Sequence, residues 1–216
     1  HLLSRPIKGE RNPGTPRVLI LAPTRELVMQ VTDEARQLAA HCDLNIIPIF
    51  GGMDFKAQQS QLKSRPVDII VGTPGRLLDF SRRRVLRLKN VEILVIDEAD
   101  RMLDMGFIPD VRKIIYATPQ KGSRQTLLFS ATLTEAITRL AASWTRDPVH
   151  VAIEPEQVAV DSVEQLVYIV TSQDKFALLY NIIVQQDLSR VLVFCNRKDW
   201  VKKLADRLNR YRSEEH

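Results

Sequence analysis

The sequence predicts an α/β fold, in which a mostly parallel β-sheet carries helices on both faces. Short, nearly continuous apolar runs alternate with longer amphipathic stretches along the 216 residues. Strands that are apolar on both sides indicate that helices cover both faces of the sheet. Parallel strands need long crossover connections, and the amphipathic stretches are long enough to supply them. A doubly wound sheet is therefore expected.

The strands of this sheet are predicted by six apolar runs in the first part of the chain. These are residues 17–22, 45–50, 67–72, 91–96, 126–129 and 148–153. Between the first two runs, apolar residues from Leu27 to Ala39 recur at helical spacing, and residues 134–144 repeat that pattern. These stretches predict helices that pack on the sheet.

The chain is expected to divide into two domains. Residues 1–153 form the first domain, which lacks its beginning, and the polar segment 154–162 is a linker. Residues 163–216 start a second α/β domain that is not completed. In it, residues 165–170 and 190–195 predict strands, and residues 173–184 and 199–208 predict helices. The tail 212–216 continues no strand pattern and is treated as frayed or foreign.

Composition narrows the function only slightly. The 31 Lys and Arg exceed the 26 Asp and Glu, a balance that is compatible with nucleic-acid binding but is shared by many other proteins. No apolar run is long enough to cross a bilayer and no signal-peptide pattern opens the chain, so a cytoplasmic location without membrane contact is expected. Cys42 and Cys195 show neither disulfide nor zinc spacing and are expected to be buried free thiols.

Two strand ends carry an arginine where a helix is expected to begin. Thr24 and Thr73 are good N-caps, yet Arg25 and Arg76 then lie in first helical turns, where the helix dipole disfavours a cation. A bound anion would resolve this conflict, because free N–H groups at a helix N-terminus bind phosphate. Both junctions are expected at the carboxyl edge of the sheet. A single junction of this kind is commonly structural, whereas two on one edge leave phosphate binding and a purely structural role as equal alternatives.

A third strand end is acidic. Asp97, Glu98 and Asp100 follow the run 91–96, and three carboxylates so close together call for a cation. Mg²⁺ fits, since it binds through one or two carboxylates while it keeps water and phosphate ligands. The alternative is an acidic helix start, which is common. Ser130 and Thr132 follow the next run, and by themselves they indicate capping of a helix.

Taken in order, these strings resemble the motifs of the DEAD-box ATP-dependent RNA helicases of superfamily 2, which are built from two RecA-like domains. Residues 22–27 (APTREL) resemble motif Ia, Gly51-Gly52 the GG motif, and Thr73-Pro74-Gly75-Arg76 motif Ib. Asp97-Glu98-Ala99-Asp100 resembles motif II, Ser130-Ala131-Thr132 motif III, and residues 193–197 motif IV of the second RecA-like domain. Residues 104–107 and 154–157 are most similar to bacterial RhlB-type members. Another superfamily 2 motor that acts on DNA fits these strings less well.

The resemblance implies roles for these residues. Asp97 would hold Mg²⁺ through water, and Glu98 would orient and deprotonate the water that attacks the γ-phosphate of ATP. Ser130 and Thr132 would hydrogen-bond Asp100 and couple the ATP site to domain movement. RNA would be gripped by its backbone, without regard to base sequence, through residues of both domains. These residues are Pro23, Thr24, Arg25, Gly51, Gly52, Thr73, Pro74, Gly75, Arg76, Asn196 and Arg197.

The sequence also departs from the family pattern. It contains no Gly-x-x-x-x-Gly-Lys-Thr phosphate loop, no Q motif and no motifs V and VI, so it is expected to be an internal fragment without ATPase activity of its own. An RNA-binding or partner-docking module that needs no nucleotide is the rival hypothesis. The likeness to RhlB implies a place in an RNA-degradation complex, and a monomer is favoured.

Some residues near these motifs are expected to be structural. Met102, Met105 and Phe107 predict core packing, and Trp144 and Trp200 predict core or interdomain positions. The basic run of residues 82–89 either extends the RNA surface or is a solvated helix end, and the second reading is favoured.

Overall fold

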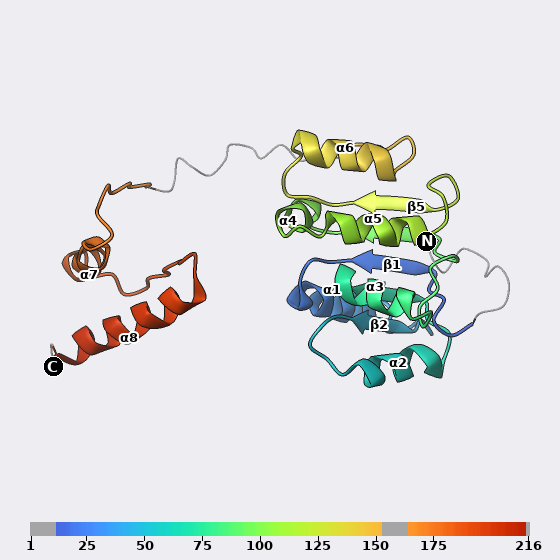
Figure 1. The fold of residues 1–216 in the computed structure, drawn as a ribbon, viewed down its shortest axis with the longest axis horizontal. Helices are drawn as coiled ribbons and strands as arrows, with labels where there is room; N and C mark the ends of the chain where they lie inside the picture. Colours follow the sequence, from blue (N-terminus) through green and yellow to red (C-terminus); the bar gives the residue numbers. More distant parts are fainter. Residues whose placement is uncertain (1–11, 153–163, 215–216) are drawn as a thin grey trace. The chain divides into compact units, whose positions relative to one another are not determined.

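The computed structural model describes residues 12–152 and 164–214, and the expected linker 154–162 lies outside the described residues. The chain forms two compact units, residues 1–151 and 152–216 (Figure 1). No helix among the described residues combines the length and the apolar character that a membrane span needs.

The first unit contains a five-stranded parallel sheet in the order β2-β3-β1-β4-β5. Its strands are β1 (Val18–Leu21), β2 (Ile46–Ile49), β3 (Ile69–Gly72), β4 (Ile93–Ile96) and β5 (Gln125–Leu128). Its helices are α1 (Arg25–Leu38), α2 (Phe55–Ser64), α3 (Pro74–Arg82), α4 (Ala99–Asp104), α5 (Ile108–Ala117) and α6 (Glu135–Trp144). The predicted doubly wound α/β fold is confirmed, and the first five strands lie within one or two residues of their predicted positions.

The two faces of the sheet carry different numbers of helices. Alternate strand residues such as Leu19, Ile70 and Leu94 share one apolar core with residues of α2 to α6. On the other face, Ala22 and Val71 form a smaller cluster with Val28 of α1. Figure 1 shows α3 and α5 in front of the sheet and α1 behind it. Successive side chains of a strand point to opposite faces of the sheet, so the two clusters lie on opposite faces. Most of the buried apolar side chains belong to the larger cluster.

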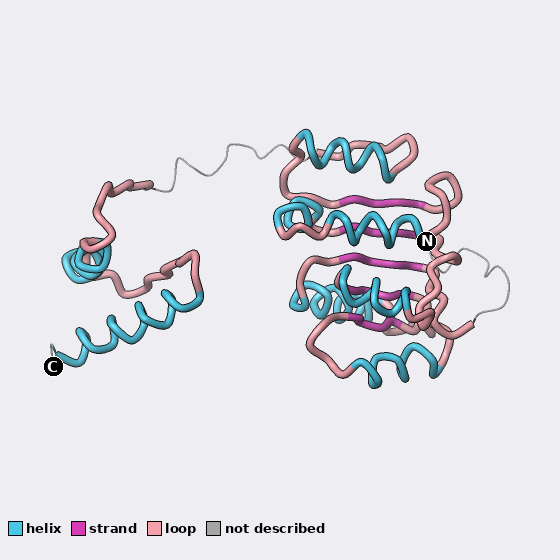
Figure 2. Tube along the Cα trace, viewed as in Figure 1, coloured by secondary structure: helices cyan, strands magenta, loops and turns pink. Residues whose placement is uncertain are grey.

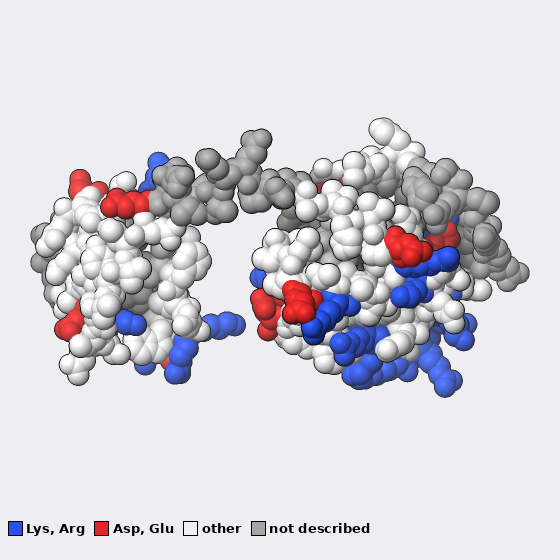
Figure 3. Space-filling model, turned by 90° about the horizontal axis from the view of Figure 1, so that it is seen from above, with Lys and Arg blue, Asp and Glu red and all other residues white. Residues whose placement is uncertain are grey.

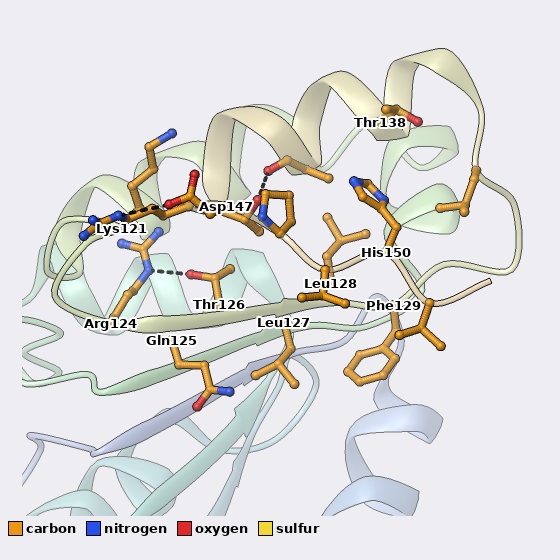
Figure 4. A pocket seen from close by; sticks show the side chains of 17 residues that line it. Lys121, Arg124, Gln125, Thr126, Leu127, Leu128, Phe129, Thr138, Asp147 and His150 are labelled. Atoms are coloured by element: carbon orange, nitrogen blue, oxygen red, sulfur yellow. Dashed lines mark hydrogen bonds and ion pairs between the residues drawn. The ribbon is translucent and has the colours of Figure 1, made fainter.

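A buried arginine ties β5 to the two helices beside it. Arg124 is 8% exposed, and its guanidinium donates to the Thr126 hydroxyl at 3.1 Å (Figure 4). It also donates to the Thr118 hydroxyl at 2.8 Å and to the carbonyls of Pro119 and Trp144. Burial lowers the pKa of Arg124. These bonds compensate for the loss of water around the charge, so the side chain fastens the ends of α5 and α6 to the edge strand.

The prediction of a sixth strand at residues 148–153 is wrong for residues 148–152, the part of this range that the structure describes. Residues 148–152 form no strand, and Val149 and Val151 are more than four-fifths exposed. A hollow of about 470 Å³ is lined by β5, α6 and residues 145–151 (Figure 4). The segment lies across this hollow from β5, so its backbone forms no ladder despite its strand-like composition.

The second unit has helices α7 (Lys175–Gln185) and α8 (Lys198–Glu214), as the spacing predicts, and α8 runs into the predicted frayed tail. The strands predicted at residues 165–170 and 190–195 are not formed (Figure 2). Ile169 and Phe194 in these segments are almost fully exposed. A helix closes its hydrogen bonds within itself, whereas a strand needs a neighbour, and these segments do not pair.

Several structural predictions are confirmed and others are wrong. Met102 and Trp144 are buried, and Phe107 packs against the core. Met105 is 47% exposed, because α4 ends at Asp104 and the chain turns through Gly106 at φ 72°. Trp200 is 57% exposed on α8. Cys42 and Cys195 are free, as predicted, but both are partly exposed instead of buried.

Removing the Arg124 guanidinium should destabilise the first unit. We expect Arg124→Met to lower the free energy of unfolding by about 3 kcal/mol, since it leaves buried acceptors unpaired. Urea denaturation followed by circular dichroism measures this change. The matched control is Arg139→Met on α6, whose side chain is 76% exposed and whose loss should cost less than about 0.5 kcal/mol. Equal effects of the two substitutions would contradict the role of Arg124.

Candidate functional site

The predicted site residues of the first unit follow the carboxyl ends of all five parallel strands, so they lie along one edge of the sheet. The strand order sorts them by chemistry. Gly51-Gly52, the Thr73–Arg76 turn and the Thr24-Arg25 turn follow β2, β3 and β1, which are neighbours. The acidic turn and Ser130 follow β4 and β5. The edge therefore has a basic half and a half of carboxylates and hydroxyls, which meet between β1 and β4.

The basic half begins where α1 starts. The Thr24 hydroxyl accepts from the Leu27 amide at 3.3 Å and caps α1, as the sequence predicts. The Arg25 guanidinium lies against Gly52, where a Cβ atom would come within 3.1 Å of Nη1. Gly52 also has a φ of 87°, a conformation that favours glycine. The GG turn and motif Ia are thus in direct contact, and a side chain at residue 52 would displace Arg25.

Gln58 holds the GG turn in place, and nothing in the sequence marked it. It is 1% exposed, and its amide forms two hydrogen bonds with the backbone of Phe50, the residue before Gly51. Buried polar side chains are normally paired in this way. Gln58 therefore fixes the end of β2 and with it the position of Gly51.

Arg76 is held in a cage of aromatic rings. Phe55 and Phe80 are stacked with ring centroids 4.5 Å apart, and the Arg76 guanidinium lies 5.8 Å and 6.0 Å from their centroids. Nη2 donates to the carbonyl of Met53 at 3.2 Å, whereas Nη1 is buried and has no hydrogen-bond partner among the residues that the structure describes. Leaving a buried donor unpaired costs about 1–3 kcal/mol. A phosphate oxygen that reached this guanidinium would remove that cost.

The α3 helix begins at this point. Thr73 is its N-cap residue, as predicted, and Pro74 occupies the first turn, but the Thr73 hydroxyl makes no capping hydrogen bond. The first-turn amides of α3 are therefore not satisfied by this cap. Gly75 is exposed beside them.

In the acidic half, Glu98 has an unusual backbone. Its φ and ψ are 47° and 54°, the left-handed region, which costs a residue with a side chain about 1–2 kcal/mol. Its carboxylate forms an ion pair with Arg101 at 3.0 Å. Strain of this kind persists where the surrounding structure imposes it, and it is common at functional sites. Arg101 lies three residues along from Glu98 on α4, a spacing from which the pair could have been predicted.

Asp97 carries a charge that its surroundings oppose. Burial raises its pKa, the Glu98 amide lowers it by donating to Oδ1 at 2.9 Å, and the negative Glu98 raises it, with a net upward shift. Oδ2 accepts no hydrogen bond from any described residue. No group of three metal-ligating side chains occurs among the described residues. A single half-buried carboxylate suits a Mg²⁺ ion that keeps most of its water ligands, so the donor set fits this cation.

Asp100 is joined to the turn after β5. Its Oδ2 accepts from the Thr132 amide at 3.0 Å and from the Thr132 hydroxyl at 3.1 Å, and Ser130 donates to the Thr132 carbonyl at 2.8 Å. Burial raises the pKa of Asp100, but the hydrogen bonds from Arg101 and Thr132, together with the nearby Ser130 hydroxyl, outweigh it and hold the pKa below its ordinary value. The structure therefore connects the turns after β4 and β5 through Asp100.

The last two predicted site residues lie in the second unit. Asn196 and Arg197 are exposed at the start of α8, and Arg197 forms a two-point ion pair with Asp199 at 3.1 Å. That pair occupies the guanidinium edge that would meet a phosphate.

Comparisons with known proteins identify the family to which this chain belongs. The sequence pattern of the family "DEAD/DEAH box helicase" matches residues 2–140. The chain belongs to the DEAD/DEAH box helicase family. It is 56% identical over 209 residues to "ATP-dependent RNA helicase RhlB" of Pseudomonas aeruginosa and 40% identical over 211 residues to the protein of that name from Xanthomonas axonopodis. These matches cover 97% of this chain and 53% and 37% of the two relatives.

A solved structure supports the same family. The chain is similar to the crystal structure of a hypothetical ATP-dependent RNA helicase from Sulfolobus tokodaii, with a TM-score of 0.56 and 39% sequence identity. That match covers 61% of this chain and 38% of the other. This helicase family member thus spans about half the length of the Pseudomonas aeruginosa relative.

The bonds from the turn after β5 should control the titration of Asp100. We expect Thr132→Ala to raise the lowered Asp100 pKa toward the ordinary value of an aspartate side chain. Because the folded-state pKa is lowered, Asp100 stabilises the fold above its unfolded pKa, and this stability is lost as the pH falls through the folded pKa. Carboxyl-carbon NMR titration measures the change. Thr138→Ala on α6 is the control and should leave the titration unchanged.

The backbone of Glu98 should favour glycine. We expect Glu98→Gly to be more stable than Glu98→Ala by about 1 kcal/mol, since only glycine adopts this conformation without strain. Thermal unfolding measures the difference. At Gln30, an exposed residue inside α1, the same pair of substitutions should rank in the opposite order by about the same amount. Greater stability of the alanine variant at both positions would show that Glu98 is not strained.

Proposed function

We propose that this chain is part of an ATP-dependent RNA helicase, in which one edge of the first unit's sheet binds RNA and supplies the carboxylates that act in ATP hydrolysis. The observation that carries the proposal is the division of that edge. Arginines and exposed glycines follow β2, β3 and β1, and carboxylates joined to hydroxyls follow β4 and β5. A phosphate backbone suits the first half, and a nucleotide with its divalent cation suits the second.

The residues of the acidic half would divide the chemistry between them. Asp97 would hold Mg²⁺ through its water ligands, and the ion would neutralise phosphate charge. Glu98 would accept the proton of the attacking water. Arg101 would orient the Glu98 carboxylate through their 3.0 Å ion pair. The strained backbone of Glu98 turns the chain sharply between β4 and α4, so two adjacent carboxylates can face the same phosphate group.

The Asp100 contact would link hydrolysis to movement. Thr132 bonds Asp100 through both its amide and its hydroxyl, so a shift of the turn after β5 must move α4 or break two hydrogen bonds. Glu98 is the N-cap residue of α4, so a shift of α4 would change the position of the proposed base. Ser130 fixes the conformation of the same turn through the Thr132 carbonyl.

RNA binding is proposed through contacts to the sugar-phosphate backbone. Arg25 and Arg76 supply the charge, and Gly51 and Gly75 are exposed and let the backbone of the strand come close. Asn196 and Arg197 of the second unit are proposed as further contacts to the RNA backbone, for which Arg197 must exchange its Asp199 pair for a phosphate. The place in an RNA-degradation complex, the monomeric state and the cytoplasmic location stay predictions.

The proposed base can be tested in the full gene product. We expect Glu98→Gln to slow RNA-stimulated phosphate release from ATP about 100-fold or more, because the amide cannot accept the proton of water. RNA affinity should be unchanged. Glu34→Gln on α1, which lies away from the edge, is the control and should hydrolyse ATP normally. RNA binding together with no hydrolysis by the unaltered protein would support the nucleotide-independent module instead.

A further inference from the structure

A second basic surface lies at the opposite end of α3 from Arg76. It surrounds a hollow of about 900 Å³, which we call the α3–β4 corner and which is lined by residues before β1, after α3 and after α5. These segments come before β1, β4 and β5, so the corner lies at the amino edge of the sheet. The hollow is within the range of sizes that ligand sites have.

The charge of the corner is of one sign. Arg84, Arg87 and Lys89 line the hollow, and none of the described residues that line it is acidic. All three side chains are exposed, and within the described parts of the chain none of them forms an ion pair. Arg83, next to them, differs because it is paired with Asp79 at 2.8 Å and stacked on Phe55 at 4.6 Å. Figure 3 shows Lys and Arg side chains gathered on the surface of the first unit. Three unpaired cations around one hollow favour an anionic ligand.

The corner also offers an aromatic surface. Tyr116, near the end of α5, lines the hollow and is 86% exposed. A large aromatic side chain with so little packing contributes little to the core. Exposed aromatic rings beside cations are the usual means of binding single-stranded nucleic acid, since bases stack on the ring while the cations contact phosphates. An acidic peptide would use the cations but would gain little from the ring.

The loop that carries the cations is fixed by its backbone. Arg84 has a φ of 60°, and the amides of Val85 and Leu86 both donate to the Phe80 carbonyl, at 3.0 Å and 3.2 Å. The Arg87 amide donates to the Gly14 carbonyl at 2.8 Å and ties the loop to the segment before β1. The cations are thus presented by an ordered backbone, which reduces the entropy lost on binding.

The position of the corner relates it to the proposed RNA edge. The α3 helix has nine residues and runs from Arg76 back toward the amino edge, a length of about 14 Å. Arg76 and Arg83 approach the same Phe55 ring, at 5.8 Å and 4.6 Å from its centroid. Arg76, Arg83 and Arg84 therefore place guanidinium groups at both ends of α3, from the RNA edge to the corner.

We propose that the α3–β4 corner binds single-stranded RNA that continues beyond the Arg25 and Arg76 edge, with a base stacked on Tyr116 and phosphates at Arg84, Arg87 and Lys89. This inference rests on the proposed RNA-binding function. It assigns the chain a second contact region, so that the strand is held at both ends of α3. RNA with a single-stranded extension would then bind better than RNA that covers the edge alone.

The test is fluorescence anisotropy of a labelled oligouridylate of about 15 nucleotides with the unaltered chain and its variants. We expect the triple variant Arg84→Gln, Arg87→Gln, Lys89→Gln to bind about tenfold more weakly and to lower the salt slope by about 2. Tyr116→Ala should weaken binding about tenfold, and Tyr116→Phe should restore it. The control removes the same charge elsewhere through Lys63→Gln, Lys113→Gln and Arg139→Gln.

The outcomes separate this inference from the proposed function. If Arg25→Ala with Arg76→Ala weakens binding while the corner triple variant behaves like the charge-matched control, the corner inference is wrong and RNA binding at the edge stands. If the unaltered chain binds no RNA, both fail. If a polyglutamate peptide binds through the three cations and RNA does not, the corner is a peptide site and the RNA assignment is overturned. Thermal unfolding of each variant confirms that it is folded.

Discussion

The parallel pairing of the five strands is the constraint on which the rest of the first unit depends. Because β1 pairs with β3 and β4 in parallel, and β2 and β5 pair in parallel outside them, every strand ends at the same edge. If β4 ran in the opposite direction, Asp97 and Glu98 would lie at the amino edge, away from Arg25. The helices then return the chain across the sheet, mostly over one face.

The buried and partly buried polar groups at the two edges of the sheet differ in how well they are satisfied. At the amino edge, Arg17 and Glu92 form a two-point ion pair at 2.7 Å and 3.3 Å, and Asp68 accepts from the Asn45 amide. These bonds hold the strand starts in register. At the carboxyl edge, three residues each carry an energetic cost. Arg76 has a buried donor with no partner in the described parts of the chain, Asp97 has a raised pKa, and Glu98 has a left-handed backbone.

The first two of these costs are electrostatic and have a direction. An unpaired guanidinium donor is relieved by an anion, and a carboxylate that resists ionisation is relieved by a cation. A nucleic-acid backbone would bring the anion to Arg76 in the basic half, and a metal-bound nucleotide would bring the cation to Asp97 in the acidic half. The stability that the edge gives up is small compared with the core beneath it, where Leu19, Leu21, Ile49 and Ile96 are fully buried. A well-packed sheet can therefore support a site whose groups are only satisfied by ligands.

The sequence by itself predicted helices α1, α6, α7 and α8, the positions of the five strands and the motif residues that follow those strands. The helical spacing in α1 and α6, the Thr24 cap and the motif strings that mark the family are all local in the chain.

What only the tertiary structure decided is which strands pair and what surrounds each motif. Residues 148–152 and 165–170 read as strands but have no neighbour to bond, since a strand is completed by another part of the chain. The order β2-β3-β1-β4-β5, the Phe55–Phe80 cage around Arg76 and the Gln58 bonds to Phe50 likewise depend on contacts between residues distant in sequence, which no local pattern encodes.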